Sequence, residues 1–468
     1  MSGTFSILNL GWTAMMTHRL AGDVASHNIS NATTPGYSRQ RADLQARQPW
    51  LSMVGPMGTG VKAVGIDRIQ DGLLFQRLMD AGSDSGFGSS RVAVLQAAQT
   101  VVGVGDDDPV ASSLNSFFQA LEDLSANPSG MAERQKVLSQ AAQLGTTMAQ
   151  VRGELDGIRK DLDAQVTGVV DEIQGRLDEI AVLNKEVRLT EASGGQANDL
   201  RDRRELLARE VADRIGAKIF SDDDGNLNLM LNAGGTLVEG DTSSHLEVQP
   251  DPANGGLMVP VLVSGAGVRT VLDASISGEL GGILSSRDNE VAKSILDLDT
   301  LAFELAGQVN AIHQAGFGLD GVNGRNLFSN IAVVDGAAAA LTVDAAVVGQ
   351  PDAVAAAQDA GALPGDNRVA LALAALGDSD TMSGGSQTFS EYLLASESDL
   401  GTGLQNAQAD AQLHSDRLSQ LVSMRESVAG VSIDEEMIEM TKAQRAFEAA
   451  AKVIKTGDEL LETVMGLK

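Results

Sequence analysis

The 468-residue chain contains no cysteine and few aromatic residues. Without cysteine it cannot form a disulfide framework, a thiol nucleophile, an iron–sulfur cluster or a cysteine-ligated zinc site. Aromatic residues make up 3% of the chain, whereas hydrophobic residues make up 43%, so Ala, Leu and Val must form most of the core. Aromatic platforms that stack sugars or bases are therefore not expected, and the length suits about three domains.

Basic residues are also scarce, with 34 Lys and Arg against 63 Asp and Glu and a net charge of −29. Such a chain repels phosphate backbones, so nucleic acid is not an expected partner. The acidity is uneven. Residues 1–50 hold four arginines against two aspartates, and residues 431–468 hold five basic against eight acidic residues. The middle of the chain therefore carries nearly all the net charge, as a solvated outer surface would, while the nearly neutral ends suit packed assembly helices.

Long uninterrupted hydrophobic runs are missing too. The most apolar long stretch, residues 331–349, includes Asp335 and Asp344, each costly at a bilayer centre, so no membrane insertion is expected. The first 16 residues lack a basic leader, and Asn9 and Gly11 interrupt their apolar run. We therefore expect no cleaved secretory signal, and any export must use another route.

Motifs for catalysis and for metal or cofactor binding are not found. The five histidines are scattered without metal-ligand spacing, and neither a P-loop nor a complete dinucleotide fingerprint occurs. The Asp222–Gly225 run departs from the calcium-loop spacing and indicates a hairpin turn. Asp106–Asp108 precede Pro109, which suits an N-cap aspartate with proline in the first helical turn. The sequence thus predicts no catalytic residues, no cofactor and no metal.

Helical periodicity dominates both halves of the chain. The first helix is expected to end near Asn31, because Pro35-Gly36 fits the central positions of a type II turn that leads into an extended segment, residues 37–45. Residues 133–187 predict a long helix or helix pair. Its apolar stripe, from Val151 to Ile180, advances about 3.6 residues per step, which favours a straight strut over a left-handed coiled coil. Four glycines within this stretch leave a break possible.

A β-rich insertion follows at residues 216–282, where short β-branched segments alternate with turn residues. Helical patterns resume over residues 285–315 and 389–428, whereas residues 332–365 lack a clear period. Ser432 and Glu435 match a capping box that would start a last helix running almost to Lys468. The fold class expected is therefore mainly α with an inserted small β domain, α+β overall. We expect an elongated multidomain chain, with a long helical shaft and with terminal helices paired as a coiled-coil-like bundle.

Both terminal helices carry an apolar stripe, which either fills a core or forms an assembly interface. The positions in these stripes are Phe5, Leu8, Trp12, Met15, Leu20, Val24, Met437, Met440, Phe447, Ala451, Ile454, Leu461 and Val464. A single helix pair hides such stripes poorly, and self-assembly would complete their burial.

Two terminal segments carry a family resemblance. Residues 26–40, SHNISNATTPGYSRQ, resemble the N-terminal signature of bacterial flagellar rod, hook and hook-associated proteins, with Asn28, Asn31, Pro35, Gly36 and Tyr37 forming the signature turn. Residues 426–437 and 449–456 look like the C-terminal signature of the hook-associated protein 1 family. Residues 127–130 and 195–200 also favour that family. Thr441-Lys442 and Phe447 depart from its usual pattern.

The resemblance implies a structural axial protein that forms the hook–filament junction by self-assembly. Residues 1–45 with 430–468 would form the inner tube, residues 46–215 with 283–429 the shaft with minor β elements, and residues 216–282 an outer domain. It implies an extracellular, flagellar location after type III export without signal cleavage. The implied partners are further copies of the chain, hook protein, the next junction protein and an export chaperone at the C-terminal helix. Another axial protein, such as hook protein or flagellin, and a wall hydrolase using a carboxylate pair are the alternatives.

Overall fold

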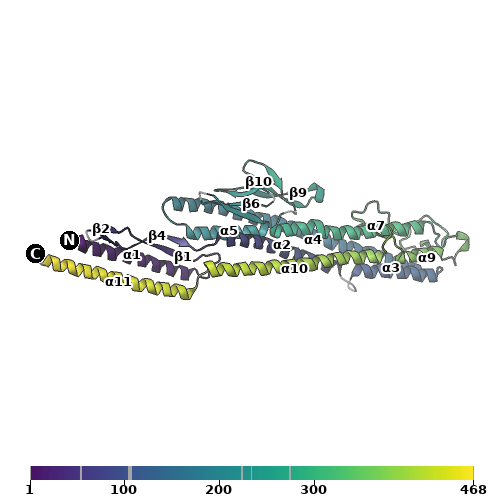
Figure 1. The fold of residues 1–468 in the computed structure, drawn as a ribbon. Helices are drawn as coiled ribbons and strands as arrows, with labels where there is room; N and C mark the ends of the chain where they lie inside the picture. The colour runs from purple at the N-terminus through teal and green to yellow at the C-terminus, as the bar shows by residue number, and fades with distance from the viewer. Residues whose placement is uncertain are drawn as a thin grey trace.

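The molecule is an elongated rod with both termini at one end (Figure 1). The computed structural model describes residues 2–52, 55–103, 108–222, 225–232, 234–273 and 276–466. Helices run along the rod, and small sheets lie on its side. The mainly α fold with a small β insertion is therefore confirmed.

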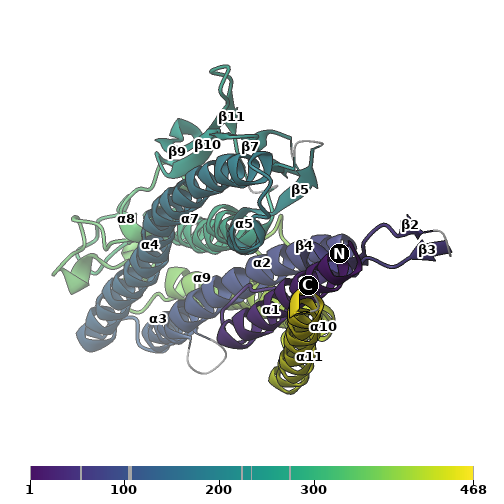
Figure 2. The same ribbon diagram turned by 90° about the vertical axis from the view of Figure 1, so that its left-hand side faces the viewer.

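The terminal arm consists of two long helices and two β ribbons. Helix α1 (Ser2–Ser30) packs lengthwise on α11 (Ile433–Gly466). Strand β1 (Gln40–Ala46) pairs antiparallel with β4 (Val61–Arg68) and has an irregularity between Asp43 and Leu44. Between them, β2 (Trp50–Ser52) and β3 (Gly55–Met57) form a separate ribbon that projects sideways (Figure 2). The β1–β4 ribbon contacts α1, which makes it part of the arm.

Several helices of the shaft lie along the rod, and one of them is exceptionally long. They are α2 (Gly72–Val102), α3 (Pro109–Ala126), α4 (Met131–Ala192), α5 (Asn198–Ile215) and α10 (Phe389–Ala429). Helix α4 has 62 residues and at 1.5 Å per residue is about 93 Å long. Its predicted stripe is buried except for the half-buried Ile158, which confirms the strut. The break considered at the glycines does not occur, because α4 is one continuous helix from Met131 to Ala192. A Cβ at Gly153, Gly157, Gly168 or Gly175 would meet open space, so no close contact requires these glycines.

The insertion forms two antiparallel sheets that pack on α4. One sheet has the order β5 (Ala217–Ser221), β6 (Leu227–Leu231), β7 (Thr236–Glu239), β8 (Thr242–Ser243). The other has the order β11 (Arg269–Val271), β10 (Met258–Val263), β9 (His245–Pro250), and a 3₁₀ turn at Pro252–Asn254 precedes β10. The pairing of β6 with β7 shifts register between Leu229 and Met230.

The chain returns through α6 (Gly278–Ser285), a π-helical turn (Ser286–Val291) and α7 (Ala292–Gln314). The helix expected from residue 285 thus begins earlier and contains the π turn, where buried Arg287 donates to Asp163, Asp288 and the Met258 carbonyl. The far end of the rod includes α8 (Ala337–Ala340), 3₁₀ turns at Pro351–Ala353, Ala360–Ala362 and Leu376–Asp378, and α9 (Arg368–Ala375). Residues 332–365 are mostly irregular and are held by polar side chains such as Asp299, which accepts from the N–H groups of Gly336 and Ala338.

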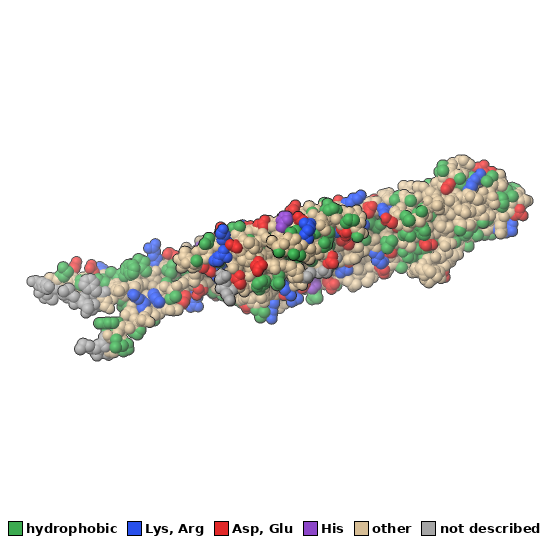
Figure 3. All heavy atoms as spheres, turned by 90° about the horizontal axis from the view of Figure 1, so that it is seen from above, with side chains coloured by type: hydrophobic (Ala, Val, Ile, Leu, Met, Phe, Trp, Pro, Cys, Tyr) green, Lys and Arg blue, Asp and Glu red, His purple; other side chains and the backbone are tan. Residues whose placement is uncertain are grey.

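The main core runs through the shaft and the β insertion, and a smaller cluster joins α2 to α10. Leu, Val and Ala dominate it, and Phe117, Phe118, Phe328 and Phe389 gather at its far end, with ring centroids 5.5–6.1 Å apart. Asp108 caps α3 by accepting from the Val110 N–H at 2.7 Å, as predicted; Asp106 and Asp107, like Asp223 and Asp224 of the predicted hairpin turn, lie outside the described residues. Acidic and basic side chains are interspersed along the face of the rod seen in Figure 3.

Candidate assembly interface

The seam between the two terminal helices is lined by small residues. A Cβ on Gly11 would lie 2.7 Å from Ile454 Cγ1, and a Cβ on Gly457 would lie 3.0 Å from Leu8 Cδ2. Ala443 and Ala450 are buried in the same seam. Glycine and alanine let the helix backbones approach closely, so large side chains are displaced to the flanks. This packing signal was missed in the sequence, where the large apolar residues drew attention.

The predicted stripe residues divide into three groups. Val24 is buried, and the half-buried residues are Leu8, Met15, Leu20, Met440, Phe447, Ala451, Ile454 and Leu461. Trp12 and Met437 remain 54% and 52% exposed, so pairing within one chain does not cover them. The side chains of Phe5 and Val464 lie outside the described part of the molecule.

Further large apolar side chains of the terminal arm are exposed to solvent. They are Leu10, Met16, Ile433, Ile438, Val453, Leu460 and Met465. A surface helix of a monomer normally shows one apolar stripe toward its core, whereas this pair is apolar on its outer faces as well. Exposed apolar surface of this extent is typical of an interaction site.

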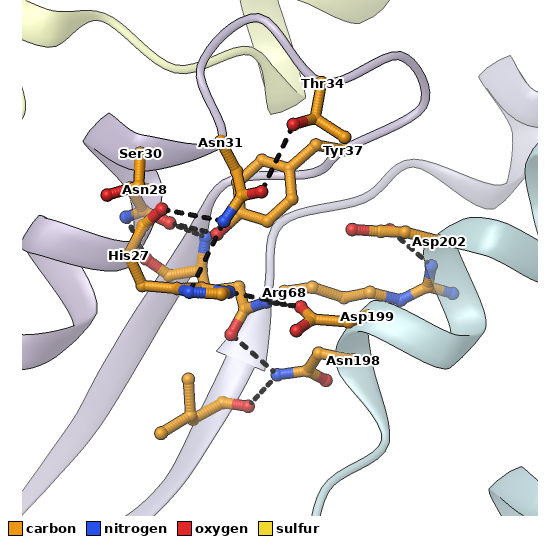
Figure 4. Close-up of polar contacts among 12 residues, drawn as sticks. His27, Asn28, Ser30, Asn31, Thr34, Tyr37, Arg68, Asn198, Asp199 and Asp202 are labelled. Atoms are coloured by element: carbon orange, nitrogen blue, oxygen red, sulfur yellow. Dashed lines mark hydrogen bonds and ion pairs between the residues drawn. The ribbon is translucent and has the colours of Figure 1, made fainter.

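The signature turn lies where the terminal arm meets the shaft (Figure 4). Pro35 and Gly36 occupy its central positions, Gly36 has a φ of +80°, and the Tyr37 N–H donates to the Thr34 carbonyl at 3.2 Å. The predicted type II turn is therefore present. Before it, the Asn31 side chain donates to the His27 carbonyl at 3.1 Å and helps to end α1.

Asn28 is the centre of a buried hydrogen-bond network. Its Nδ2 donates to the Gln40 carbonyl at 2.8 Å and to Glu436 Oε2 at 2.9 Å, while its Oδ1 accepts from the Tyr37 hydroxyl at 2.8 Å and the Gln40 N–H at 2.9 Å. All four hydrogen-bonding positions of this amide group are thus used. Burial, reinforced by nearby carboxylates, raises the pKa of Tyr37, so its hydroxyl stays a donor.

The N- and C-terminal signatures meet at two glutamates. Arg39 Nε donates to Glu436 Oε1 at 2.6 Å, and its Nη1 donates to Glu435 Oε2 at 2.9 Å. The predicted capping box is therefore only partly formed: Ser432 Oγ accepts from the Glu435 N–H at 3.5 Å, but the Glu435 carboxylate is engaged by Arg39. The Glu435 carboxylate thus bonds to a cationic guanidinium, so both partners of this hydrogen bond are ionised.

Hydrogen bonds to helix α5 connect this network to the shaft. The Ser38 N–H donates to Asp202 Oδ2 at 2.8 Å, and Arg68 Nη1 donates to Asp202 Oδ1 at 3.0 Å. Arg68 also pairs with Glu205. Burial raises the pKa of Asp202, while the Ser38 and Arg68 donors oppose the rise.

Residues at the start of α5 make further hydrogen bonds to the terminal arm. Gln40 Nε2 donates to Asp199 Oδ1 at 2.7 Å, and the Asn198 amide donates to the Ile66 carbonyl. The family-like segment 195–200 pointed to this region, but pairing of Arg68 with Asp202 had no local signal because these residues lie far apart in sequence.

The described residues hold no cluster of three or more metal-ligating side chains. Among them His313 is buried, which lowers its pKa to about 4, and its ring bridges the Arg325 carbonyl and the Ala355 N–H. This histidine thus has a structural partner on each side. No helix in the described part combines the length and hydrophobicity needed to span a membrane.

Comparison with known families bears on the whole chain. The model described as the flagellar hook-associated protein FlgK helical domain matches residues 95–328, half of the chain. The chain belongs to the FlgK family. A second model, described as the flagellar basal body rod FlgEFG protein C-terminal, matches residues 426–467, the α11 region that pairs with α1.

FlgK-family relatives align along nearly the full length. Flagellar hook-associated protein 1 of Bacillus subtilis (strain 168) is 27% identical, with 99% of this chain and 98% of the relative covered. Its Escherichia coli (strain K12) counterpart is 23% identical, with 99% and 100% covered. The solved flagellar hook junction protein FlgK from Burkholderia pseudomallei superimposes with a TM-score of 0.69 at 16% identity, over 76% of this chain and all of that one, which shows a shared fold.

Proposed function

We propose that this chain is a structural axial protein of the bacterial flagellum and forms the junction between hook and filament by self-assembly. The observation that carries the proposal is the meeting of both signature segments at Glu436, at the base of a helix pair whose outer faces are apolar. A lone chain leaves Trp12 and Met437 in water, whereas packing against neighbours would cover them. The names of the relatives point to the same role.

The proposal assigns one role to each part of the rod. Residues 1–45 with 430–468 form the inner tube, residues 46–215 with 283–429 form the shaft, and residues 216–282 form an outer domain. In support, the β insertion lies on the outside of α4, at a distance from the terminal pair (Figures 1 and 2). The predicted stripe residues are the proposed tube contacts, and Asn28, Asn31, Pro35, Gly36 and Tyr37 hold the tube to the shaft.

The proposed partners follow from the junction role. Besides further copies of this chain they are hook protein on one side, the next hook-associated protein on the other, and an export chaperone on the exposed face of α11. We further propose export through the flagellar type III apparatus without removal of a signal peptide. In support, residues 8–25 pack on α11 as part of the folded arm. Mass spectrometry of the protein from isolated flagella tests this, since a shortened N-terminus would refute it.

The proposed role involves no catalysis, and two rivals make different predictions. Another axial protein, such as hook protein or flagellin, would build hook or filament rather than the boundary between them. A wall hydrolase would clear cell-wall substrate in zymography with the purified chain, and reproducible lysis would overturn the structural role.

A deletion strain of the source bacterium tests the proposal as a whole. We expect complete hooks without filaments and filament protein shed into the medium, with both defects restored by the unmodified gene. Normal filaments on the deletion strain would contradict the junction role, and loss of hooks themselves would favour another axial protein.

A further inference from the structure

An arginine-lined cleft lies beside the signature turn, where the start of α2, helix α5, strand β5 and the end of α10 meet. Its free volume is about 360 Å³. Arg68, Arg201, Arg204 and Arg425 line it, although the chain as a whole carries a net charge of −29. Four guanidinium groups in one cleft of so acidic a protein call for a specific anionic partner.

Among the residues that the structure describes, two of these arginines form ion pairs with carboxylates of the chain. Arg68 pairs with Asp202 and Glu205, and Arg201 makes a two-point contact with Glu191. Within the described ranges, Arg204 and Arg425 form no ion pair. Their hydrogen bonds go to neutral acceptors.

Those neutral acceptors leave each group without a carboxylate in direct contact, although Glu205 and Glu191 lie near enough to Arg204 to favour its charged form. Arg204 Nη1 donates to Asn184 Oδ1 at 2.8 Å and to the Gly225 carbonyl at 3.1 Å. Arg425 Nη2 donates to the Gly36 carbonyl at 2.8 Å and the Tyr37 carbonyl at 3.1 Å. Burying a guanidinium without an anion is costly, so an external carboxylate would be bound favourably.

Buried donors in the cleft are also unused. The Nε–H groups of Arg68 and Arg204 are buried and have no hydrogen-bond partner, and both side chains are at least nine-tenths buried. Burial lowers the pKa of Arg204 to about 10. Asp71 also lines the cleft and contributes one negative charge, and its carboxylate caps α2. Together with Asp202, Glu205 and Glu191, Asp71 balances the four arginines, so the cleft has no overall positive surplus. Local placement of one or two carboxylates at Arg204 and Arg425 therefore suits it better than a phosphate dianion.

The rim of the cleft indicates a protein partner rather than a free ion. Leu73, Phe220 and Val428 line the cleft, and all three are exposed. A small carboxylate would leave this apolar rim in water, whereas an acidic segment with an apolar neighbour would cover it.

Such a segment lies near the C-terminal end of α11, whereas the cleft lies near its N-terminal end. Asp458, Glu459 and Glu462 are exposed around Leu460, which is 45% exposed. Glu459 approaches Lys455 at 3.9 Å, whereas Asp458 and Glu462 form no ion pair in the part of the chain that the structure describes. About 30 helical residues, or roughly 45 Å, separate this segment from the cleft in the same chain, so the two cannot meet within one copy.

We propose that the arginine cleft of one copy binds the Asp458–Glu462 segment of a second copy, with Arg204 and Arg425 receiving its carboxylates. This inference rests on the proposed self-assembly and specifies one of its contacts. Complementary patches at two different sites of one chain join copies head to tail, and repetition of such a contact builds a ring or a helical layer rather than a closed dimer.

Cross-linking in isolated flagella tests this contact, and the absence of native cysteine makes it specific. A deletion strain would express the full chain with Phe220→Cys and Leu460→Cys, and a short bismaleimide would be added to the purified flagella. We expect a ladder of covalent dimers, trimers and larger species, because each copy offers one cysteine at each end. Either single-cysteine chain should remain monomeric, because the proposed contact pairs residue 220 of one copy with residue 460 of another. The control pair Leu413→Cys and Leu460→Cys places the partner cysteine on an exposed site of α10 and should give no ladder.

Charge reversal identifies the interaction. Adding Asp458→Lys and Glu462→Lys to the double-cysteine chain should lower the ladder yield at least about tenfold, while Glu448→Lys, an exposed site on the same helix, should leave it unchanged. An undiminished ladder after reversal, or an equal ladder from the Leu413 control, would overturn the inference. Filament attachment by the unmodified chain is scored separately, so failure there would count against the proposed function instead.

Discussion

The terminal arm and the shaft differ in how much of their apolar surface is buried within one chain. In the shaft, large side chains such as Phe117, Leu144 and Leu177 are fully buried within a single chain. In the arm, glycine and alanine form the seam, while Trp12, Met437 and Leu460 remain exposed. The core of the shaft is therefore complete within one chain, whereas the arm leaves apolar surface exposed for contact with neighbouring copies. The hydrogen-bond network around Asn28 joins the two regions.

Both tryptophans of the chain, Trp12 and Trp50, lie in the arm, which allows the regions to be followed separately. Tryptophan fluorescence reports on the arm, and far-UV circular dichroism is dominated by the long shaft helices. The following changes are arranged by their expected effect on the free energy of unfolding.

The largest effect is expected in the shaft core. Phe117→Ala removes a fully buried ring that packs against Phe118 and Phe328 and should destabilise the shaft by about 3–5 kcal/mol. The circular dichroism transition in urea should shift to lower concentration. Exposed Leu371→Ala, in the same part of the rod, serves as the control, and equal shifts for both variants would contradict the described core.

The next effect concerns the link between the regions. Asn28→Ala leaves the buried Glu436 carboxylate and Tyr37 hydroxyl short of a partner and should destabilise the arm by about 2–3 kcal/mol. Tryptophan fluorescence should change at lower urea, with little change in the shaft transition. Asn9→Ala, on an exposed face of the same helix, should leave both transitions unchanged; a shaft transition that moves with the arm would show that the two unfold as one unit.

A smaller, stabilising effect is expected at Asp213 of α5. Burial raises its pKa to about 6 from an ordinary 3.8, so its charged form opposes folding above pH 6, and this cost disappears below about pH 4. Asp213→Asn should therefore stabilise the shaft by about 1–2 kcal/mol at pH 7.5 and not at pH 4. Thermal melts at both pH values test this against exposed Asp171→Asn, and a gain of equal size at pH 4 would refute it.

The smallest effect on stability should come with the largest effect on assembly. Trp12→Asp changes a side chain that is 54% exposed, so we expect less than about 0.5 kcal/mol of destabilisation in the isolated chain. In the deletion strain the variant should nevertheless fail to attach filaments, because a charge would enter the inter-copy contact. Ser6→Asp, at an exposed polar site of α1, is the control, and filaments on cells that carry Trp12→Asp would contradict the assembly role of this face.

Periodicity and turn chemistry anticipated most of the fold. The α4 stripe, the turn at Pro35-Gly36 and the Asp108 cap depend on neighbours in sequence, so they could be predicted from local pattern. The seam at Gly11 and Gly457, the pairing of Arg68 with Asp202, and the engagement of Glu435 by Arg39 depend on partners distant in sequence. These long-range contacts could not be predicted from local sequence pattern. The capping box that does form, between Thr388 and Glu391 at the start of α10, was overlooked although its spacing was visible.

Residues 332–365 show most clearly which structure could not be predicted from the sequence. Small residues there pack into the core and are held by polar contacts from distant side chains such as Asp299 and His313. These contacts leave no period in the sequence. The site prediction was incomplete where small residues form the seam, and the assembly role of the stripe residues stays a prediction.

Amide hydrogen exchange of the full chain, free in solution and assembled in isolated flagella, tests the contrast between arm and shaft most directly. The account predicts that in the free chain α1 and α11 exchange at least about tenfold faster than the buried stripe of α4, and that assembly slows the terminal helices while leaving α4 unchanged. Equal protection of the terminal helices and α4 in the free chain, with no change on assembly, would contradict it.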